Sequence, residues 1–479
     1  MNYKMISHTL GWILMFESAF LTVPLATALI YGEKQSALAF LACCGICLVI
    51  GFLMTVRKPK NKVLRSRDGF VVVALSWVVL SIFGALPFMF SGVTSSYVDA
   101  LFETASGFST TGATIFTDVE VLPRSIIMWR SFTHWIGGMG ILVFVMAFLP
   151  LSGGTNMYIM RAESTGASIS KPVPKIKTTA LLLYVVYLAL TVILAVILLI
   201  LRVDLFAAVN IAFSTAGTGG FGFLNDSMAS FSPAVQLVVA VFMLLFSINF
   251  GSYFLLFRGK VKEALNTEVK VFIAIVAGSV LCIALNISSM YDSFGEALRH
   301  SFFTVASIVS TTGFSTENFD LWPSFSHIII LLIMFIGACA GSTGGGIKVS
   351  RVIVIFKLMI RELSTALHPK QVKKITVDGA VVDKDVVRSI YGFMFCYIAL
   401  FIGAILLISF DGENFATNFT AVAATISNAG PGLSRVGPVM NYSFFSPVSK
   451  LVLTFCMLAG RLELYPMLLL FVPSTWKKS

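Results

Sequence analysis

Long apolar stretches alternate with short polar turns along the whole chain. Most of the stretches approach or exceed the roughly 20 residues that an α-helix needs to cross a bilayer. The pattern predicts ten membrane spans, at residues 10–31, 36–56, 70–90, 126–150, 179–201, 234–257, 271–290, 325–360, 389–409 and 447–471. Because ten is an even number, we expect both termini on the same side of the membrane.

The composition supports an all-α polytopic membrane protein. Hydrophobic residues make up 57% of the chain and charged residues only 12%, whereas soluble domains carry about 25% charged residues. Residues 1–28 loosely resemble a signal peptide. Glu17 interrupts their apolar core, and the next turn is positively charged in register, so we expect this segment to remain as the first span.

Lysine and arginine gather in every second turn. The basic residues are Arg57, Lys58, Lys60, Lys62, Arg65 and Arg67, then Arg161, Lys171, Lys175 and Lys177, then Arg258, Lys260, Lys262 and Lys270, then Lys348, Arg351, Lys357, Arg361, Lys370, Lys373, Lys374, Lys384 and Arg388, and finally Lys477 and Lys478. The positive-inside rule makes these turns and both termini cytoplasmic. The net charge of +11 follows from this pattern and does not indicate a nucleic-acid partner.

The opposite turns collect acids. They are Asp99, Asp118, Glu120, Asp204, Asp226, Asp292, Glu296, Glu317, Asp320, Asp411 and Glu413. As a group they would concentrate cations at an outer opening. Each acid taken singly is better explained as a solvated loop residue.

One segment occurs four times. Residues 301–313 read SFFTVASIVSTTG, and three other segments align with them without a gap: NFTAVAATISNAG at 418–430, AVNIAFSTAGTGG at 208–220 and ALFETASGFSTTG at 100–112. Each follows an outer turn, runs through about nine mainly apolar or small residues, and ends in a polar tract that closes with glycine. We define the four polar tracts as residues 110–112, 218–220, 311–313 and 428–430.

About ten apolar residues are too few to cross a bilayer. Each segment is therefore interpreted as a half-helix that enters from outside, stops at the midplane and returns as extended backbone. Such backbone is tolerated at this depth only where protein buries it or where it lines a water-filled path. Four copies predict a pseudo-fourfold ring around one pore, in which the recurring glycine permits positive φ and close approach. The negative C-terminal ends of the half-helices would favour a cation.

Residues 338–348, with the sequence ACAGSTGGGIK, interrupt the apolar run 325–360; we call them the glycine segment. A phosphate-binding loop would require a strand before it and lysine directly after its last glycine, and neither is present. The bland alternative is a flexible kink that packs closely against neighbouring helices.

A few other polar residues lie within the predicted spans. Arg461 falls in the last one, where an unpaired charge costs at least about 2.5–3.5 kcal/mol. It is expected to face the pore or a partner acid, or else to snorkel or form a structural ion pair. His134 and Asn249 are expected to form packing hydrogen bonds. Cys43, Cys44 and Cys47 lack accompanying histidines and are expected to pack as small apolar residues.

Several motifs resemble the Trk/Ktr/HKT potassium transporters, in particular the TrkH branch. The resemblance rests on TTGA at 110–113, TTGF at 311–314, NAGPG at 428–432, GSTGGGIK at 341–348, WRS at 129–131, WIGGMG at 135–140, RAES at 161–164 and GRLE at 460–463. It extends over nearly the whole chain, and the two spans before the first repeat favour the TrkH branch over Ktr.

The resemblance implies a fold of two N-terminal helices (1–57) and four fused repeats of helix, pore loop and helix. The repeats would cover residues 58–160, 161–262, 263–370 and 371–479, and the third would contain a broken inner helix with an intramembrane gate. The implied K⁺ filter consists of Thr110, Thr111, Gly112, Thr218, Gly219, Gly220, Thr311, Thr312, Gly313, Asn428, Ala429 and Gly430. Their carbonyls and hydroxyls would replace the hydration shell of the ion.

The resemblance also assigns the two inner features. The implied gate residues are Gly341, Ser342, Thr343, Gly344, Gly345, Gly346 and Lys348. Arg461 would act as an electrostatic barrier to cations in the cavity. In plant relatives, serine in place of the first-loop glycine accompanies sodium permeation, so glycine at position 112 favours potassium.

Tract two departs from the family pattern because no serine or threonine adjoins Gly220. Gly217 therefore competes as the second filter glycine, although the ungapped alignment and the match of Phe221 to Phe314 favour Gly220. Tract four has Asn428 and Ala429 in place of two threonines. An uneven ring with few hydroxyls predicts only modest selectivity over sodium.

The expected function is K⁺ uptake across the bacterial inner membrane. A proton- or sodium-coupled symporter and a non-selective K⁺/Na⁺ permease of the same fold remain alternatives. Coupling needs intramembrane acids on the pathway. Only Glu17, Glu103 and Glu463 qualify, and none of them is clearly paired, so we favour gated, channel-like permeation. An enzyme is not expected because no protease, hydrolase or paired-aspartate motif appears. A scaffold would have no use for four polar loops.

No cytoplasmic segment exceeds about 40 residues, too few for a nucleotide-binding domain. Regulation is therefore expected from outside the chain, and no cofactor besides the transported K⁺ is expected. The resemblance implies a homodimer in the bilayer and a separate cytosolic nucleotide-binding ring of the TrkA type that docks on the basic turns.

Overall fold

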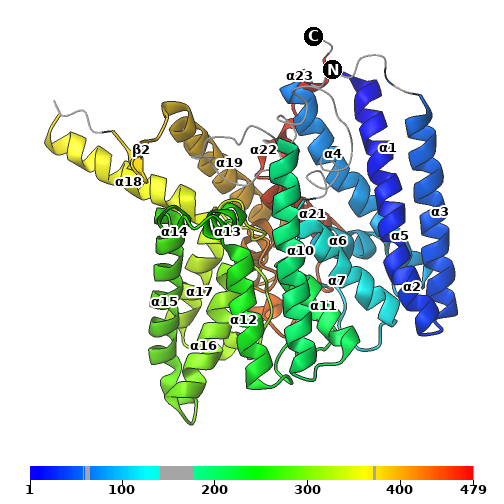
Figure 1. Cartoon of the computed structure of the whole chain (residues 1–479), viewed down its shortest axis with the longest axis horizontal. Helices are drawn as coiled ribbons and strands as arrows, with labels where there is room; N and C mark the ends of the chain where they lie inside the picture. Colours follow the sequence, from blue (N-terminus) through cyan, green and yellow to red (C-terminus); the bar gives the residue numbers. More distant parts are fainter. Residues whose placement is uncertain (58, 60–64, 141–175, 370–373, 478–479) are drawn as a thin grey trace.

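The computed structural model describes residues 1–57, 59, 65–140, 176–369 and 374–477. This part of the chain is mostly helical, with a single short hairpin (Figure 1). The α-helices are α1 (Tyr3–Phe20), α2 (Thr22–Ile30), α3 (Lys34–Val56), α4 (Ser66–Gly84), α5 (Leu86–Phe90), α6 (Tyr97–Phe108), α7 (Arg124–Gly138), α10 (Ile176–Ile200), α11 (Leu205–Ala216), α12 (Pro233–Ser247), α13 (Phe250–Phe257), α14 (Val261–Ala264), α15 (Thr267–Ile287), α16 (Phe294–Val309), α17 (Ser324–Ile336), α18 (Val349–Leu367), α19 (Lys384–Ile408), α20 (Phe415–Ile426), α21 (Pro447–Arg461), α22 (Tyr465–Leu469) and α23 (Pro473–Trp476).

The remaining elements are short. They are the 3₁₀ turns η1 (Ser288–Met290), η2 (Phe319–Leu321), η3 (Ser409–Asp411) and η4 (Ser434–Val436), and the strands β1 (Thr376–Val377) and β2 (Ala380–Val381). The two strands pair antiparallel, with Thr376 opposite Val381.

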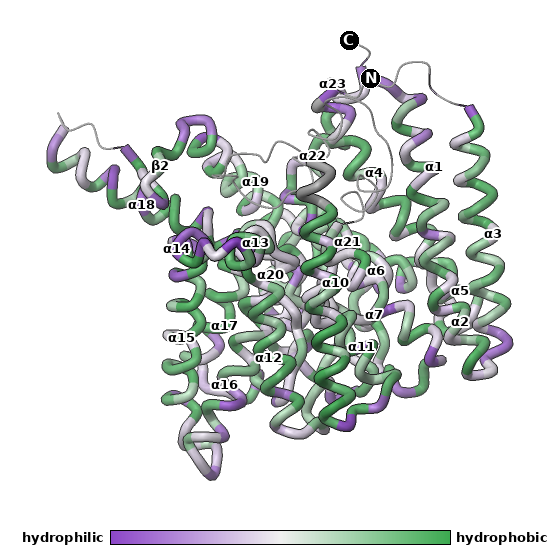
Figure 2. The backbone as a smooth tube through the Cα atoms, in the orientation of Figure 1, coloured by the Kyte–Doolittle hydropathy of each residue, from purple (hydrophilic) through white to green (hydrophobic). Residues whose placement is uncertain are grey.

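Six helices of the described part are long and apolar enough to cross a membrane, and the bent pair α12 and α13 makes a seventh span if counted as one. They are Tyr3–Ile30, Lys34–Val56, Arg67–Phe90, Leu181–Ile200, Thr267–Met290 and Lys384–Asp411. Figure 2 shows hydrophobic residues along the length of α3, α10 and α15, with hydrophilic residues gathered at helix ends and around α13 and α14. The chain is a multi-pass membrane protein.

Several of the ten predicted spans are not continuous helices, including 234–257, which divides between α12 and α13 at an angle of 91°. The span at 126–150 begins as α7 and runs into residues outside the described ranges. The run 325–360 consists of α17, a non-helical segment and α18, and the run 447–471 divides at Leu462 between α21 and α22. A hydropathy window does not detect such breaks, because glycine and small polar residues lower the mean only slightly.

The N-terminal helices form one edge of the molecule in Figure 1. α1 and α3 approach closely because Gly11 and Gly51 face each other: a Cβ on Gly11 would lie 2.8 Å from the Gly51 oxygen, and one on Gly51 2.7 Å from the Gly11 oxygen. Small residues permit such contacts between membrane helices. The start of α1 also meets the C-terminal end, where the Tyr3 hydroxyl donates to the Trp476 carbonyl over 2.5 Å.

The four short helices α6, α11, α16 and α20 begin at polar caps. Side-chain oxygens of Ser96, Asp204, Ser293 and Asn414 accept hydrogen bonds from the first turns of these helices. These are the residue types that best satisfy the free amides at a helix N-terminus. Most side chains of the four helices are buried, and α6, α11 and α20 have 12 residues each. At 1.5 Å per residue, such a helix spans about 18 Å, roughly half the bilayer core.

Glu17 is buried in the N-terminal part of the fold. Its side chain is 0% exposed, and neither carboxylate oxygen has a hydrogen-bond partner in the described part of the chain. A Cβ added to Gly84 on α4 would lie 3.1 Å from its Oε1 atom. A buried polar group without a partner costs about 1–3 kcal/mol.

We therefore predict that Glu17→Leu raises the thermal unfolding midpoint of the purified protein in detergent. The substitution removes an unpartnered polar group and keeps most of its volume. Glu33→Leu is the matched comparison, because the Glu33 carboxylate accepts from Arg124 N and Ser125 N over 2.6 and 3.1 Å, and it should lower the midpoint. A lower midpoint for Glu17→Leu would contradict this account.

Candidate functional site

The four short helices end in the same backbone motif. In each, the amide two residues beyond the last helical residue bonds a carbonyl three residues back, and the following amide bonds a carbonyl five residues back, which is the Schellman pattern. The first bonds are Thr110 to Gly107, Thr218 to Thr215, Thr311 to Ile308 and Asn428 to Thr425; the second are Thr111 to Ser106, Gly219 to Ser214, Thr312 to Ser307 and Ala429 to Ala424. The repeat found in the sequence is therefore a repeat of geometry at these helix ends.

Each tract opens on a strained residue. Thr110, Thr218, Thr311 and Asn428 have φ values of 55°, 53°, 60° and 56°. A β-branched residue at positive φ is a genuine outlier, and such conformations cost on the order of 1–3 kcal/mol each and cluster at functional sites. Glycine usually holds this position in a Schellman motif. The side chain is kept in spite of the strain, which marks the tracts as candidates for function.

Each tract closes on a glycine with positive φ. The values are 81° for Gly112, 80° for Gly220, 90° for Gly313 and 84° for Gly430. Gly217, which competes with Gly220 in the sequence, instead caps α11 with a φ of −68°. Gly220 is thus the geometric equivalent of the other three glycines.

The four tracts contact one another in cyclic order. A Cβ on Gly112 would lie 2.0 Å from the Gly219 oxygen, one on Gly220 1.9 Å from the Thr312 oxygen, one on Gly313 2.6 Å from the Ala429 oxygen, and one on Gly430 2.6 Å from the Thr111 oxygen. The second residue of each tract thus turns its carbonyl towards the glycine of a neighbour. No side chain fits at any of the four glycine positions.

All four glycines line one cavity of about 140 Å³. Its walls come from the segments that follow the tracts, and the only charged side chain among the described lining residues is Arg130. The predicted outer acids do not line it. Asp118 and Glu120 instead hold Asn225 of the next loop, through Asn225 Nδ2 to Asp118 Oδ1 at 2.8 Å and Asn225 N to Glu120 Oε1 at 2.9 Å. The hydrogen bond from Asn225 lowers the pKa of Asp118.

The outer loops are joined in the same cyclic order. We number the outer loops by the tract that each one follows. Loops one and two meet at Asn225. Three further contacts close the circle: Met228 N to the Ser315 carbonyl at 2.9 Å, Ser434 N to Asp320 Oδ1 at 2.7 Å, and Tyr442 N to the Thr114 carbonyl at 2.8 Å. The ring of tracts is therefore supported on its outer side by a second ring of hydrogen bonds.

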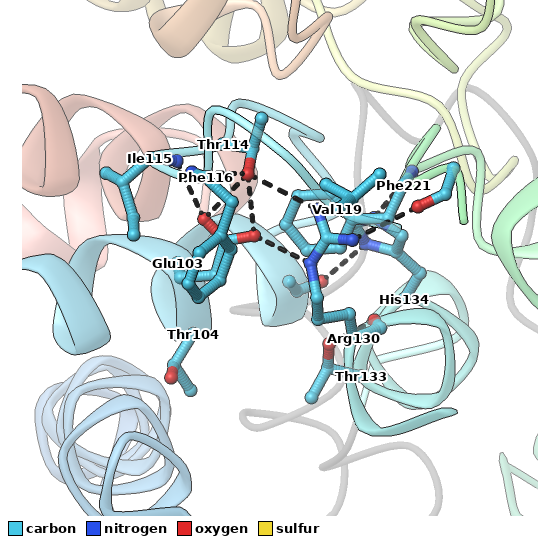
Figure 3. A network of polar contacts seen from close by, with 12 residues as sticks. Glu103, Thr104, Thr114, Ile115, Phe116, Val119, Arg130, Thr133, His134 and Phe221 are labelled. Carbon is cyan, nitrogen blue, oxygen red and sulfur yellow. Dashed lines mark hydrogen bonds and ion pairs between the residues drawn. The ribbon is translucent and has the colours of Figure 1, made fainter. Parts of the chain in front are cut away.

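A buried ion pair joins loops one and two behind the tracts (Figure 3). Arg130 Nε donates to Glu103 Oε1 over 2.8 Å, with side chains 2% and 0% exposed. Glu103 also accepts from Thr114 Oγ1 and Ile115 N, and Arg130 donates to the Gly222 carbonyl over 3.1 Å. Its guanidinium lies 4.1 Å from the centre of the Phe221 ring. The pair fixes both loops to α6 and α7.

His134 makes a second link between the same two loops. Its Nδ1 lies 2.8 Å from the Gly107 carbonyl, and Phe221 N donates to its Nε2 over 3.2 Å. These are packing hydrogen bonds of the kind that the sequence predicts for His134. The sequence signal for the buried role of Glu103 is Arg130, because an arginine inside an apolar helix requires a buried partner.

The glycine segment contacts the inner side of tracts three and four. Gly345 N donates to Thr311 Oγ1 over 2.6 Å. A Cβ on Gly344 would lie 2.8 Å from the Ser310 oxygen, and one on Gly345 2.3 Å from the Ser427 oxygen. Lys348, with a φ of 83°, donates from Nζ to the Gly344 carbonyl. The segment is therefore packed against the ends of α16 and α20.

The rest of the segment is also held within the protein. Ser342 Oγ donates to the Cys339 carbonyl over 2.6 Å, and Thr343 Oγ1 to the Phe246 carbonyl over 3.1 Å. Gly341 and Gly346 have φ values of 70° and 80°, a conformation that glycine adopts without strain. The segment is thus closely packed against its neighbours, as both the gate and the packed kink considered from the sequence require.

Arg461 connects the glycine segment to α7. Its guanidinium donates to the Thr343 carbonyl over 2.5 Å and to the Gly137 and Gly138 carbonyls over 2.6 Å each. The side chain is 7% exposed. Glu463, two residues on, pairs with Arg351 of α18. Backbone oxygens thus hold the guanidinium of Arg461, for which the sequence predicts the pore or a partner acid as surroundings.

The Glu103–Arg130 pair gives a test of the network. We predict that Arg130→Met alone lowers the unfolding free energy by about 3–5 kcal/mol, because it strands a buried carboxylate. The double variant Glu103→Gln/Arg130→Met should lose clearly less than the two single variants summed, since no charge is stranded. Thermal unfolding in detergent checks this, and strictly additive losses would show that the two residues act independently.

The chain is similar to known proteins over nearly its whole length. Residues 36–478 match the TrkH family, described as cation transport proteins. Over 100% of both chains, the sequence is 36% identical to the Trk system potassium uptake protein TrkH of Escherichia coli strain K12. It is 31% identical to the Trk system potassium uptake protein TrkG of the same strain, with 99% of each chain covered.

A solved structure agrees with these matches. The crystal structure of the potassium transporter TrkH from Vibrio parahaemolyticus superposes with a TM-score of 0.90 at 34% identity, with 100% of both chains covered. The all-α membrane fold, the resemblance drawn from the motifs and the expectation of a transporter in place of an enzyme are confirmed. The chain belongs to the TrkH family of cation transport proteins.

Proposed function

We propose that this chain takes up K⁺ across the bacterial inner membrane, and that the ion passes between the four polar tracts. The observation that carries the proposal is the cyclic contact of the tracts, in which the glycine of each faces a carbonyl of a neighbour. Relatives that match over their full length are named potassium uptake proteins. Rings of backbone carbonyls replace the hydration shell of K⁺ in potassium-selective pores.

Two side chains support a cation at the inner end of the tracts. Thr110 Oγ1 and Asn428 Oδ1 are buried, and neither has a hydrogen-bond partner in the described part of the chain. Buried oxygens without partners are costly, and a dehydrated cation supplies the missing interaction. The proposed filter therefore uses side-chain oxygens as well as carbonyls.

The remaining inner side chains are occupied within the protein. Thr218 Oγ1 donates to the Gly217 carbonyl over 2.6 Å, and Asn428 Nδ2 donates to Thr111 Oγ1 and the Met457 carbonyl over 3.0 and 2.8 Å. Thr311 Oγ1 accepts from the glycine segment. Unequal side-chain oxygens around the ring favour modest selectivity for K⁺ over Na⁺, as expected from the second and fourth tracts.

We assign the glycine segment as the gate. It lies directly against tracts three and four, so an ion leaving the filter on that side meets it. Arg461 adds a positive charge at the same depth and ties the segment to α7. Displacing the segment would break this bond and move Thr343 away from the guanidinium. Opening would therefore also change the position of the proposed cation barrier.

Passive, gated permeation is favoured over coupling to protons or sodium. Of the three intramembrane acids named from the sequence, Glu103 is paired with Arg130 and Glu463 with Arg351. Glu17 is buried against Gly84 of α4 and is not among the described residues that line the cavity at the tracts. Coupling requires an acid that exchanges its ion along the pathway, and none of these three is so arranged.

The wider assembly stays a proposal. We propose a homodimer with both termini in the cytoplasm, regulated by a TrkA-type nucleotide-binding ring that docks on the basic turns. The division into two extra helices (1–57) and pore repeats at 58–160, 161–262, 263–370 and 371–479 likewise stays a prediction.

The proposed function is tested by complementation of a strain deficient in potassium uptake. At low K⁺ the wild-type chain should restore growth. Under the same conditions, Gly313→Asp should not restore growth, because a side chain at this position meets the neighbouring tract.

Gly112→Ser should lower the K⁺ over Na⁺ flux ratio in reconstituted vesicles. Gly379→Ala, in the open β-hairpin turn, is the matched control. Unchanged selectivity in Gly112→Ser would contradict the assignment of tract one.

Deleting Gly344 to Gly346 tests the gate. The deletion shortens the segment that lies under the tracts, so K⁺ flux into vesicles should rise in the absence of any cytosolic partner. The unfolding midpoint of the same preparation shows whether the fold is kept. A folded deletion variant with unaltered flux would exclude the glycine segment as the gate.

A further inference from the structure

Two broken helices satisfy each other's backbone groups. The first break lies between α12 and α13, which meet at 91°. The second is the glycine segment between α17 and α18. A helix end leaves carbonyls or amides without helical partners, and at membrane depth these groups need partners inside the protein. Here each break supplies the partners that the other lacks.

The last carbonyls of α12 show this directly. The Leu245 carbonyl accepts from the Tyr253 hydroxyl over 2.5 Å, within the corner itself. The Phe246 carbonyl accepts from Thr343 N and Thr343 Oγ1, and the Ser247 carbonyl accepts from Cys339 N over 3.1 Å. Two of the last three carbonyls of α12 are therefore satisfied by the glycine segment.

The first turn of α13 completes the exchange. Phe250 N donates to the Gly341 carbonyl over 3.1 Å. Asn249 caps the same turn by accepting from Gly251 N over 2.7 Å. A Cβ on Gly341 would lie 3.2 Å from Asn249 Nδ2, so the segment fits closely against the cap. Three backbone hydrogen bonds hold residues 339–343 in this corner.

Glu268 fixes both ends of the segment. The residue lies in the first turn of α15 and is 9% exposed. Its Oε1 atom accepts from Ala340 N over 2.7 Å and from Ser350 N over 3.1 Å. A single carboxylate oxygen thus holds the backbone on either side of residues 341–349, which include every proposed gate residue.

We propose that the corner between α12 and α13, together with Glu268, is the seat that keeps the glycine segment closed, with Glu268 as its positioning residue. The inference rests on the proposed gate function. The corner continues directly into α14 and the start of α15, whose exposed basic residues include Lys262 and Lys270. A force applied to this basic turn acts on Glu268 and on the corner at once, and releases the segment from both.

The native thiol of Cys339 reports release without any added label site. Cys339 is 0% exposed, and its backbone amide donates to the Ser247 carbonyl in the corner. Cys456 is also 0% exposed but lies in α21, outside the segment. The full-length protein in detergent is treated with N-ethylmaleimide, and modification of each cysteine is followed by mass spectrometry. Cys456 then measures general loosening of the fold.

Glu268→Ala is expected to speed modification of Cys339 about tenfold, since two buried amides lose their acceptor, and to leave Cys456 unchanged. Glu268→Gln keeps an acceptor oxygen and should restore much of the protection. Glu263→Ala is the matched control, because this exposed acid in the neighbouring helix α14 pairs only with Lys260 among the described residues. It should behave as wild type.

If Glu268→Ala speeds the modification of Cys339 and Cys456 equally, or of neither, the proposal that Glu268 and the corner hold the segment closed is wrong. K⁺ flux measured on the same variants separates this inference from the proposed function. Selective labelling of Cys339 in Glu268→Ala without higher flux would leave the seat standing and refute the gate.

Discussion

Backbone amides and carbonyls at membrane depth have to find partners inside the protein or along a water-filled path, since the hydrocarbon core itself holds no water. A continuous helix meets this requirement by itself. This chain departs from helix at the four tracts, at the α12–α13 corner and at the glycine segment, and each departure creates polar groups that must be satisfied elsewhere. The contacts among these segments follow from that requirement.

The tracts meet it in two ways. Schellman bonds satisfy the last carbonyls of each short helix, and this fixes the following residue at positive φ even where it is threonine. The tract carbonyls at Thr111, Gly219, Thr312 and Ala429 each face a neighbouring glycine. The outer ring of hydrogen bonds and the Glu103–Arg130 pair hold the segments that follow the tracts. These contacts offset the backbone strain, so the tract carbonyls are fixed in place.

The inner side is built on a different principle. The glycine segment is held by hydrogen bonds to Thr311, Arg461, Glu268 and the α12–α13 corner, which come from four separate parts of the chain. Each such bond contributes modestly, since net hydrogen-bond energies are about 0.5–1.5 kcal/mol. A unit held by several modest bonds is stable when closed and can still be released as a whole, which suits a gate better than a packed apolar core would.

The amino-acid sequence by itself determined the membrane class, the repeat and the position of its glycines. Length and hydropathy suffice for the first, and the ungapped alignment of 100–112, 208–220, 301–313 and 418–430 suffices for the others, because a local motif such as a Schellman turn depends on local residues. The break at 338–348 was visible for the same reason. The choice between Gly217 and Gly220 needed only local φ angles, but the sequence does not display them.

Only the tertiary structure decided how these parts meet. No local pattern relates Arg130 to Gly222, Arg461 to Gly137, or Glu268 to both Ala340 and Ser350, because these contacts join residues from 72 to 324 positions apart. The outer acids also have a role that their charge alone does not predict, because Asp118 and Glu120 hold Asn225 of the next loop. Hydropathy and motif depend on neighbours in sequence, whereas the partner of a buried polar group depends on which helices the fold brings together.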